Sequence, residues 1–144
     1  MTPDVNVLVA AARLEHPHHK TAFSWLELAV NAATDKPRLT LLPGVIAGYL
    51  RITTNRKIFP APTPIKAAVE FIDDLLNSEN VSVLTGAREW PQLRSMCLQK
   101  SLTANTIPDA WIAALVLEHK EVLATFDNDF LQLLPAKNLL LLKP

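Results

Sequence analysis

Three aspartates that lie far apart in the chain, each bordering a strongly apolar segment, constrain this fold more than any other feature. They are Asp4, Asp109 and Asp127. A side chain beside an apolar segment lies at the edge of the core, where desolvating a lone carboxylate costs several kcal/mol. Such a carboxylate must be paired, hydrogen-bonded or bound to a metal. Clustered acids without nearby bases indicate a divalent cation.

The composition favours one compact domain spanning residues 1–144, because 49% of the residues are hydrophobic and only 19% are charged. The longest uncharged apolar run, residues 39–50, is broken by Pro43 and is shorter than the roughly 20 residues of a membrane span. We expect no membrane anchor. There is no signal-peptide pattern at the N-terminus, and the single cysteine, Cys97, forms no internal disulfide, so we expect a cytoplasmic protein.

The hydrophobic pattern alternates between helical and strand periodicity. Helices are predicted for residues 18–34, 43–52, 63–77, 88–100 and 108–120, and strands for residues 38–42, 81–84, 121–126 and 138–142. Residues 1–4 read as a strand followed by a helix over residues 5–12, although the β-branched residues of the latter segment also suit a strand. The alternation predicts a mostly parallel sheet with helices on both faces.

In such a sheet Asp4 and Asp127 follow neighbouring parallel strands, and Asp109 opens a helix. Ligands bind open α/β sheets beyond the carboxyl ends of the strands. Clustered carboxylates raise one another's pKa unless a cation offsets the repulsion. Mg²⁺ or Mn²⁺ needs only one or two carboxylates besides substrate phosphate oxygens, and it activates water for phosphodiester hydrolysis. The pattern therefore predicts these three aspartates as the catalytic metal ligands.

Each aspartate also has an ordinary structural interpretation. Asp4 suits a helix cap, Asp109 suits the positive end of a helix dipole, and Asp127 suits a turn. Asp129 is a weaker fourth ligand, because an acid two residues past a strand is often the cap of the next helix. Their joint occurrence favours the metal site.

Three polar residues extend this candidate site. Asn6 and Thr125 flank two of the aspartates and are placed to hydrogen-bond the carboxylates or metal-bound water, with a helix cap and a strand-end hydroxyl as the alternatives. Arg51 belongs to a basic group with Arg56 and Lys57 and suits a phosphate contact, with a solvated charge patch as the alternative.

Other conspicuous residues indicate no site of their own. The histidines at positions 16, 18 and 19 lack a zinc-ligand spacing and are predicted to form a solvated helix start. Phe59 and Trp90 are predicted to pack in the core or in an interface rather than to stack on bases.

Four segments, in order along nearly the whole chain, resemble the PIN-domain ribonucleases and, among them, the VapC toxins of bacterial toxin–antitoxin pairs. They are residues 4–9 (D-V-N-V-L-V), 50–56 (L-R-I-T-T-N-R), 108–114 (P-D-A-W-I-A-A) and 125–130 (T-F-D-N-D-F). The resemblance implies a three-layer α/β/α sandwich with a central parallel sheet. It also implies RNA cleavage that depends on Mg²⁺ or Mn²⁺, a homodimer, and inhibition by a cognate antitoxin protein.

One departure from the family pattern concerns the metal site. The family usually carries a glutamate on the helix before Leu50 and Arg51, and the aligned residue here is Gly48; no acid occurs between residues 38 and 69. We therefore expect weakened metal binding, and a PIN domain that binds RNA or antitoxin without cleavage stays an alternative. A phospho-accepting receiver-like domain is a further alternative, but it would need an acidic pair near the first strand and a lysine after the last.

Overall fold

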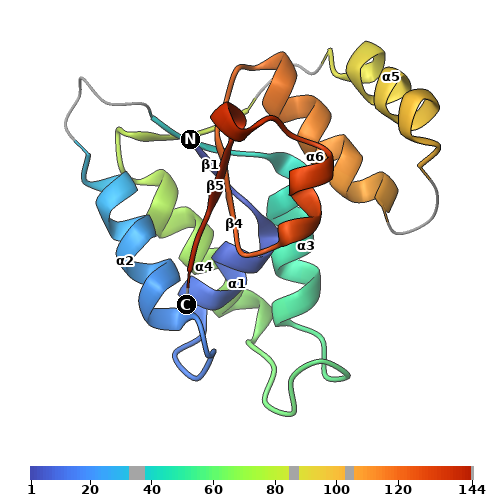
Figure 1. Cartoon of the computed structure of the whole chain (residues 1–144). Coiled ribbons are helices and arrows are strands. Elements are labelled where there is room, and N and C mark those ends of the chain that lie inside the picture. The colour runs from blue at the N-terminus through green and yellow to red at the C-terminus, as the bar shows by residue number, and fades with distance from the viewer. Residues whose placement is uncertain (33–37, 85–87, 103–105, 144) are drawn as a thin grey trace.

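The computed structural model describes residues 1–32, 38–84, 88–102 and 106–143 (Figure 1). Along the chain the elements are β1 (Thr2–Pro3), α1 (Val5–Ala12), α2 (His19–Val30), β2 (Leu39–Leu41), α3 (Pro43–Thr53), α4 (Ile65–Leu76), β3 (Val81–Val83), α5 (Trp90–Lys100), α6 (Thr106–Glu118), β4 (Leu123–Thr125) and β5 (Leu139–Leu141). Two short 3₁₀ helices, η1 (Asn128–Gln132) and η2 (Ala136–Asn138), lie between β4 and β5.

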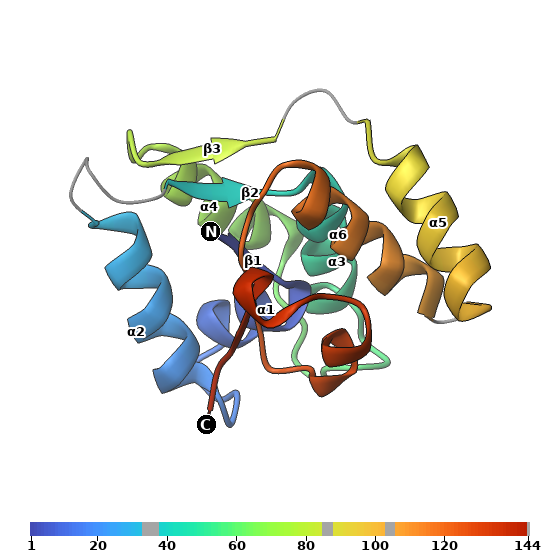
Figure 2. The same cartoon turned by 45° about the horizontal axis from the view of Figure 1, so that its top comes forward.

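All strand pairs of the described structure are parallel. Strand β4 lies between β1 and β5, and β2 pairs with β3. The backbone N–H of Thr40 donates to the carbonyl of Met1 at 2.8 Å, which joins β2 to the start of β1 and gives the spatial order 3-2-1-4-5. Figure 2 shows α2 and α5 on opposite sides of these strands. The predicted parallel sheet with flanking helices is confirmed.

The predicted elements are present, with ends that differ by a few residues. The ambiguous segment after the first strand is a helix, because Asp4 caps it by accepting a hydrogen bond from the Val5 N–H. The predicted end of the first long helix, at residues 33–37, and the side chain of Trp90 lie outside the described residues.

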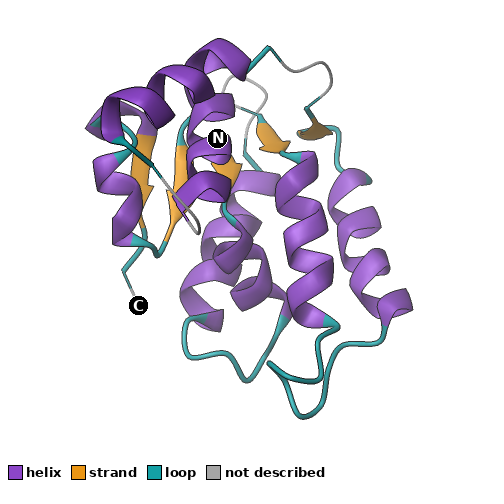
Figure 3. Cartoon of the chain, turned by 90° about the vertical axis from the view of Figure 1, so that its right-hand side faces the viewer, coloured by secondary structure: helices purple, strands orange, loops and turns teal. Residues whose placement is uncertain are grey.

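Helix α1 packs against both α2 and α3, and Figure 3 shows that helices surround the short strands. Its residues 7–11 are all buried, and so are residues 110 and 112–116 of α6. Asp4 and Asp109 thus each precede a buried helical segment, which fixes the backbone beneath both carboxylates. Within the described ranges, no helix is long and apolar enough to cross a membrane.

Candidate active site

Asp4 lies where the first strand of the sheet gives way to α1. Its backbone N–H donates to the carbonyl of Ala124 at 2.9 Å, so the residue is held against β4. Its Oδ1 accepts a hydrogen bond from the Val5 N–H at 2.6 Å. The side chain is therefore the helix cap that the sequence also allowed, and it is only 6% exposed.

A hydrogen-bond network around Thr125 fixes the other oxygen of Asp4. The Thr125 hydroxyl donates to Asp4 Oδ2 at 2.7 Å and accepts from the Asp127 backbone N–H at 3.0 Å. The Asn6 side-chain amide donates to Asp4 Oδ2 and to Thr125 Oγ1, both at 3.0 Å. The ends of β1 and β4 are thereby locked together, with Asn6 and Thr125 directly against the Asp4 carboxylate.

Asp109 lies in the first turn of α6, where the charges of the other aspartates affect its pKa. Burial and, after it, the negative charges of Asp4, Asp127 and Asp129 together raise its pKa to about 6. The pKa of Asp4 is raised as well, chiefly by burial, although hydrogen bonds from Thr125 and Val5 oppose the shift. The charges of the other three predicted acidic residues therefore act on the carboxyl group of Asp109.

Asp127 and Asp129 also form a local turn. Asp127 Oδ1 accepts a hydrogen bond from the Asp129 backbone N–H at 2.8 Å, so the turn suggested by the sequence is present. Asp129 itself is exposed, and it lines a small cavity of about 230 Å³ together with Asp109. Asp129 thus lies near Asp109, on the solvent side of the candidate site.

The donor set suits a hard divalent cation, although it is not a preformed cage. In the described ranges no three His, Cys, Asp or Glu side chains are close enough to make a ready metal-ligand group. Asp109 accepts no hydrogen bond from any described residue, and Asp127 is hydrogen-bonded through one oxygen only. Mg²⁺ commonly binds through one or two carboxylates and keeps several waters, so these free oxygens fit it without a third fixed ligand.

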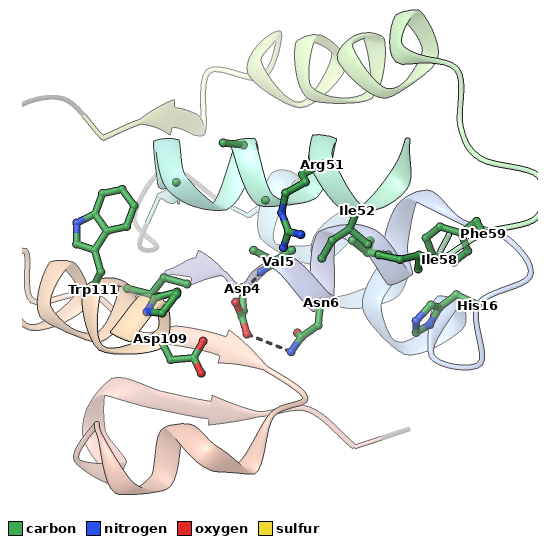
Figure 4. Close-up of a pocket in the computed structure, with 16 residues that line it drawn as sticks. Asp4, Val5, Asn6, His16, Arg51, Ile52, Ile58, Phe59, Asp109 and Trp111 are labelled. Atoms are coloured by element: carbon green, nitrogen blue, oxygen red, sulfur yellow. Dashed lines mark hydrogen bonds between the residues drawn. The ribbon is translucent and has the colours of Figure 1, made fainter. Parts of the chain in front are cut away.

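A cavity of about 790 Å³ opens beside Asp4 and Asp109 (Figure 4). Arg51 of α3 also lines it, and its guanidinium points toward Asp4. Its other lining residues, which the sequence had not associated with the site, include His16, Phe59 and Trp111. They come from loops and from the outer face of α6, so no local spacing marks them. His16, His18 and His19, around the start of α2, are half-buried rather than solvated, and His18 stacks on Phe126.

Helix α3 meets this cavity with two glycines at close contacts. A Cβ on Gly48 would lie 2.9 Å from Val5 Cγ2, and a Cβ on Gly44 would lie 2.8 Å from Trp111 Cζ3. Neither neighbour is the end of a long flexible side chain, so a larger residue at either position would displace α1 or the Trp111 ring. Position 48 therefore has no room for an acidic side chain in this packing, and α3 contributes a cation to the site but no acid.

The sheet order and the acids at its carboxyl edge define an α/β protein with an acidic site at the strand ends. The sequence pattern of the PIN domain matches residues 1–133. Ribonuclease VapC25 of Mycobacterium tuberculosis is 36% identical over 128 residues, which cover 88% of each chain. Ribonuclease VapC31 of the same species is 34% identical over 88% of each chain, and VapC ribonuclease Mb2897 of Mycobacterium bovis is 35% identical over 88% of this chain and 85% of its own. The chain belongs to the PIN domain family, among the VapC proteins.

A solved structure has the same fold. A chain in the crystal structure of VapBC2 from Rickettsia felis, bound to a DNA fragment from their promoter, superposes with a TM-score of 0.66 at 18% identity. The match covers 99% of this chain and 98% of that one. The resemblance seen in the sequence motifs and the fold class that it implied are both confirmed.

Proposed function

We propose that this protein is a metal-dependent endoribonuclease, the toxin of a VapBC-type toxin–antitoxin pair. In this proposal Asp4, Asp109 and Asp127 hold Mg²⁺ or Mn²⁺, and Asp129 assists from the solvent side. The observation that carries the proposal is that Asp4 and Asp109 line one cavity, where the charges of Asp127 and Asp129 also act on Asp109. The similar mycobacterial proteins are all named as ribonucleases, which supports the reaction class.

Several residues of the chain have separate roles in the proposed reaction. The bound ion supplies positive charge that activates water and stabilises the scissile phosphate. Thr125 and Asn6 hold the Asp4 carboxylate in one orientation. The Asp109 side chain lines the same cavity as Asp4 (Figure 4). Arg51 brings a positive charge to the wall of the adjoining cavity. No nucleophilic side chain is required, because water is the attacking group.

RNA cleavage by wild type and by Asp109→Asn, with Mn²⁺ and with excess chelator, tests this function. We expect the substitution and the chelator each to lower the rate at least about 100-fold, the effect of losing several kcal/mol of stabilisation by the metal. Asp74→Asn, an exposed acid on α4, is the matched control and should cleave as wild type does. Equal rates for Asp109→Asn and wild type would refute the site.

The proposal includes two protein partners. We infer a cognate antitoxin and a second copy of this chain, from the family resemblance. Large apolar side chains that are more than half exposed leave surface for such contacts; they are Leu14, Leu28, Ile65, Leu98 and Leu131. Light scattering should give twice the 15.9 kDa mass of one chain. A short neighbouring reading frame for a DNA-binding protein, which co-purifies with this chain, would identify the antitoxin.

A PIN domain without cleavage activity is the second candidate function. Two observations favour it: Gly48 stands where the family usually has an acid, and the described residues hold no ready metal-ligand group. Such a domain would bind RNA equally well with Mn²⁺ and with chelator and would leave it intact. The cleavage assay therefore separates the two candidates.

A further inference from the structure

We propose that the cavity beside Asp4 and Asp109 is a nucleotide subsite for single-stranded RNA. Arg51 binds the phosphate of the nucleotide adjacent to the cleaved bond, and the unstacked base lies in the apolar end of the cavity against His16 and Phe59. The inference rests on the proposed function, because the carboxylates at one end of this cavity are the proposed cleavage site.

Arg51 is a cation with no protein partner among the described residues. Arg13, by contrast, is only 8% exposed, and its guanidinium donates to Thr63 Oγ1 and to the carbonyl of Ala61, both at 2.9 Å. The guanidinium of Arg51 instead points into the cavity toward Asp4 (Figure 4). A free guanidinium group can bind two oxygens of one phosphate. A phosphate bound here would also lie close to Asp4, a proposed metal ligand.

The far end of the cavity presents two ring side chains held in place by the fold. The Arg13 guanidinium lies 3.8 Å from the Phe59 ring centroid, and the Phe59 backbone N–H donates to the carbonyl of Asn55 at 2.9 Å. Nδ1 of His16 accepts the His18 backbone N–H at 3.1 Å, so the neutral ring carries its proton on Nε2. Burial, then the nearby His18, lowers the pKa of His16, which keeps the ring uncharged at pH 7. Flat rings bind unstacked bases, and the Nε2–H is a donor for a base edge.

The shape of the cavity fits one base better than a duplex. Apolar side chains form much of the remaining lining of the cavity; they are Val5, Val9, Ile52, Ile58 and Ile112. Gly44 and Gly48 contribute no side chains to the α3 wall, and the volume of about 790 Å³ accommodates a single nucleotide. An apolar peptide would also fit the ring end. The unpartnered Arg51 between that end and the carboxylates favours a ligand with a phosphate.

Mononucleotide binding tests the subsite without any cleavage. Asp109→Asn protein with chelator is titrated with UMP, with AMP and with ribose 5-phosphate, which lacks a base, and binding is followed by NMR. We expect at least one nucleotide to bind about fivefold or more tightly than ribose 5-phosphate, because stacking of a base contributes about that factor or more. Phe59→Leu should remove this difference, whereas Phe23→Leu, an exposed ring outside the cavity, should keep it.

A separate variant tests whether Arg51 binds the phosphate. Arg51→Gln should weaken the binding of nucleotides and of ribose 5-phosphate to the same extent. Arg94→Gln, which changes an exposed arginine on α5, should leave the binding of both unchanged. If Phe59→Leu does not fold, His16→Gln tests the ring end, since it keeps an N–H donor and removes the ring.

Two results would overturn the subsite. One is equal affinity of the Asp109→Asn protein for nucleotides and for ribose 5-phosphate. The other is unchanged nucleotide binding when a ring variant is added to it, which would leave the ring end to an apolar peptide. Neither result involves metal or cleavage. If the protein cleaves RNA but fails this binding test, the proposed function stands and the subsite is refuted. If it binds nucleotides as expected but does not cleave RNA, the subsite stands and the proposed function is refuted.

Discussion

The hydroxyl of Thr125 donates a hydrogen bond to Asp4 Oδ2 at 2.7 Å, joining residues 121 positions apart in the chain. Thr125 is completely buried. Its oxygen also accepts the backbone N–H of Asp127, so one hydroxyl links the two strand ends that carry candidate metal ligands. The orientation of Asp4 therefore depends on a residue with no charge of its own.

Replacing Thr125 by valine keeps the shape of the side chain and removes the hydroxyl. The Asp127 N–H then lacks its acceptor, and Asp4 Oδ2 loses one of two donors. We expect the free energy of unfolding in urea to fall by about 1 to 3 kcal/mol. RNA cleavage should fall about tenfold to 100-fold, as is usual when a group that orients a metal ligand is lost. Thr125→Ser should recover most of both, and a valine variant as active as wild type would contradict this role.

Asp109 makes the stability of the metal-free protein depend on pH. Its pKa is about 6 in the folded chain and near 3.8 in the unfolded chain, so the folded state binds the proton more tightly. Stability should therefore fall as pH rises from about 4 to 6 and stay level above that range. Because the group is partly solvated, we expect a loss of only about 1 kcal/mol. Urea unfolding at pH 4.5 and pH 7 measures it, and Asp109→Asn should show a smaller change; identical pH profiles would disprove the assignment.

Binding of Mn²⁺ should reverse that loss at neutral pH. A cation that binds only the folded state adds about 1.4 kcal/mol at ten times its Kd, which corresponds to a rise of a few degrees in Tm. Thermal unfolding at pH 7.5 should show this rise in wild type and in Asp74→Asn, and much less of it in Asp109→Asn. A rise of the same size in Asp109→Asn would place the cation elsewhere.

Replacing Gly48 by alanine should destabilise the protein, although glycine is unfavourable within a helix. Alanine would gain up to about 1 kcal/mol in helix propensity, but its Cβ would lie 2.9 Å from Val5 Cγ2. Overpacking of this kind costs about 1 to 3 kcal/mol, so we expect a net loss of unfolding free energy in urea. Adding Val5→Ala should recover the propensity gain. A stabilised Gly48→Ala single variant would show that α1 and α3 are less tightly packed than described.

The fold and the carboxylates were accessible from the sequence because both depend on short-range patterns. Alternating periodicities predicted the parallel sheet, and the place of Asp4 and Asp127 after strands predicted one shared edge. The cavity walls depend on contacts between distant segments. Phe59 gains its position from Arg13, a residue on another loop, so no spacing in the sequence could reveal its role.

At position 48 the sequence showed a difference from the family but could not explain it. The sequence showed that an acid is missing there, but the reason depends on how closely α3 crosses α1. The contact between Gly48 and Val5 is a property of that crossing. Likewise, the raised pKa of Asp109 depends on where α6 begins relative to β1 and β4, which periodicity does not determine.

The most direct measurement is the rate of RNA cleavage by purified wild type and Asp109→Asn, each with Mn²⁺ and with excess chelator. Our account predicts cleavage only by wild type with Mn²⁺, with the other three rates at least about 100-fold lower. Equal cleavage by both proteins, or cleavage that survives the chelator, would contradict it.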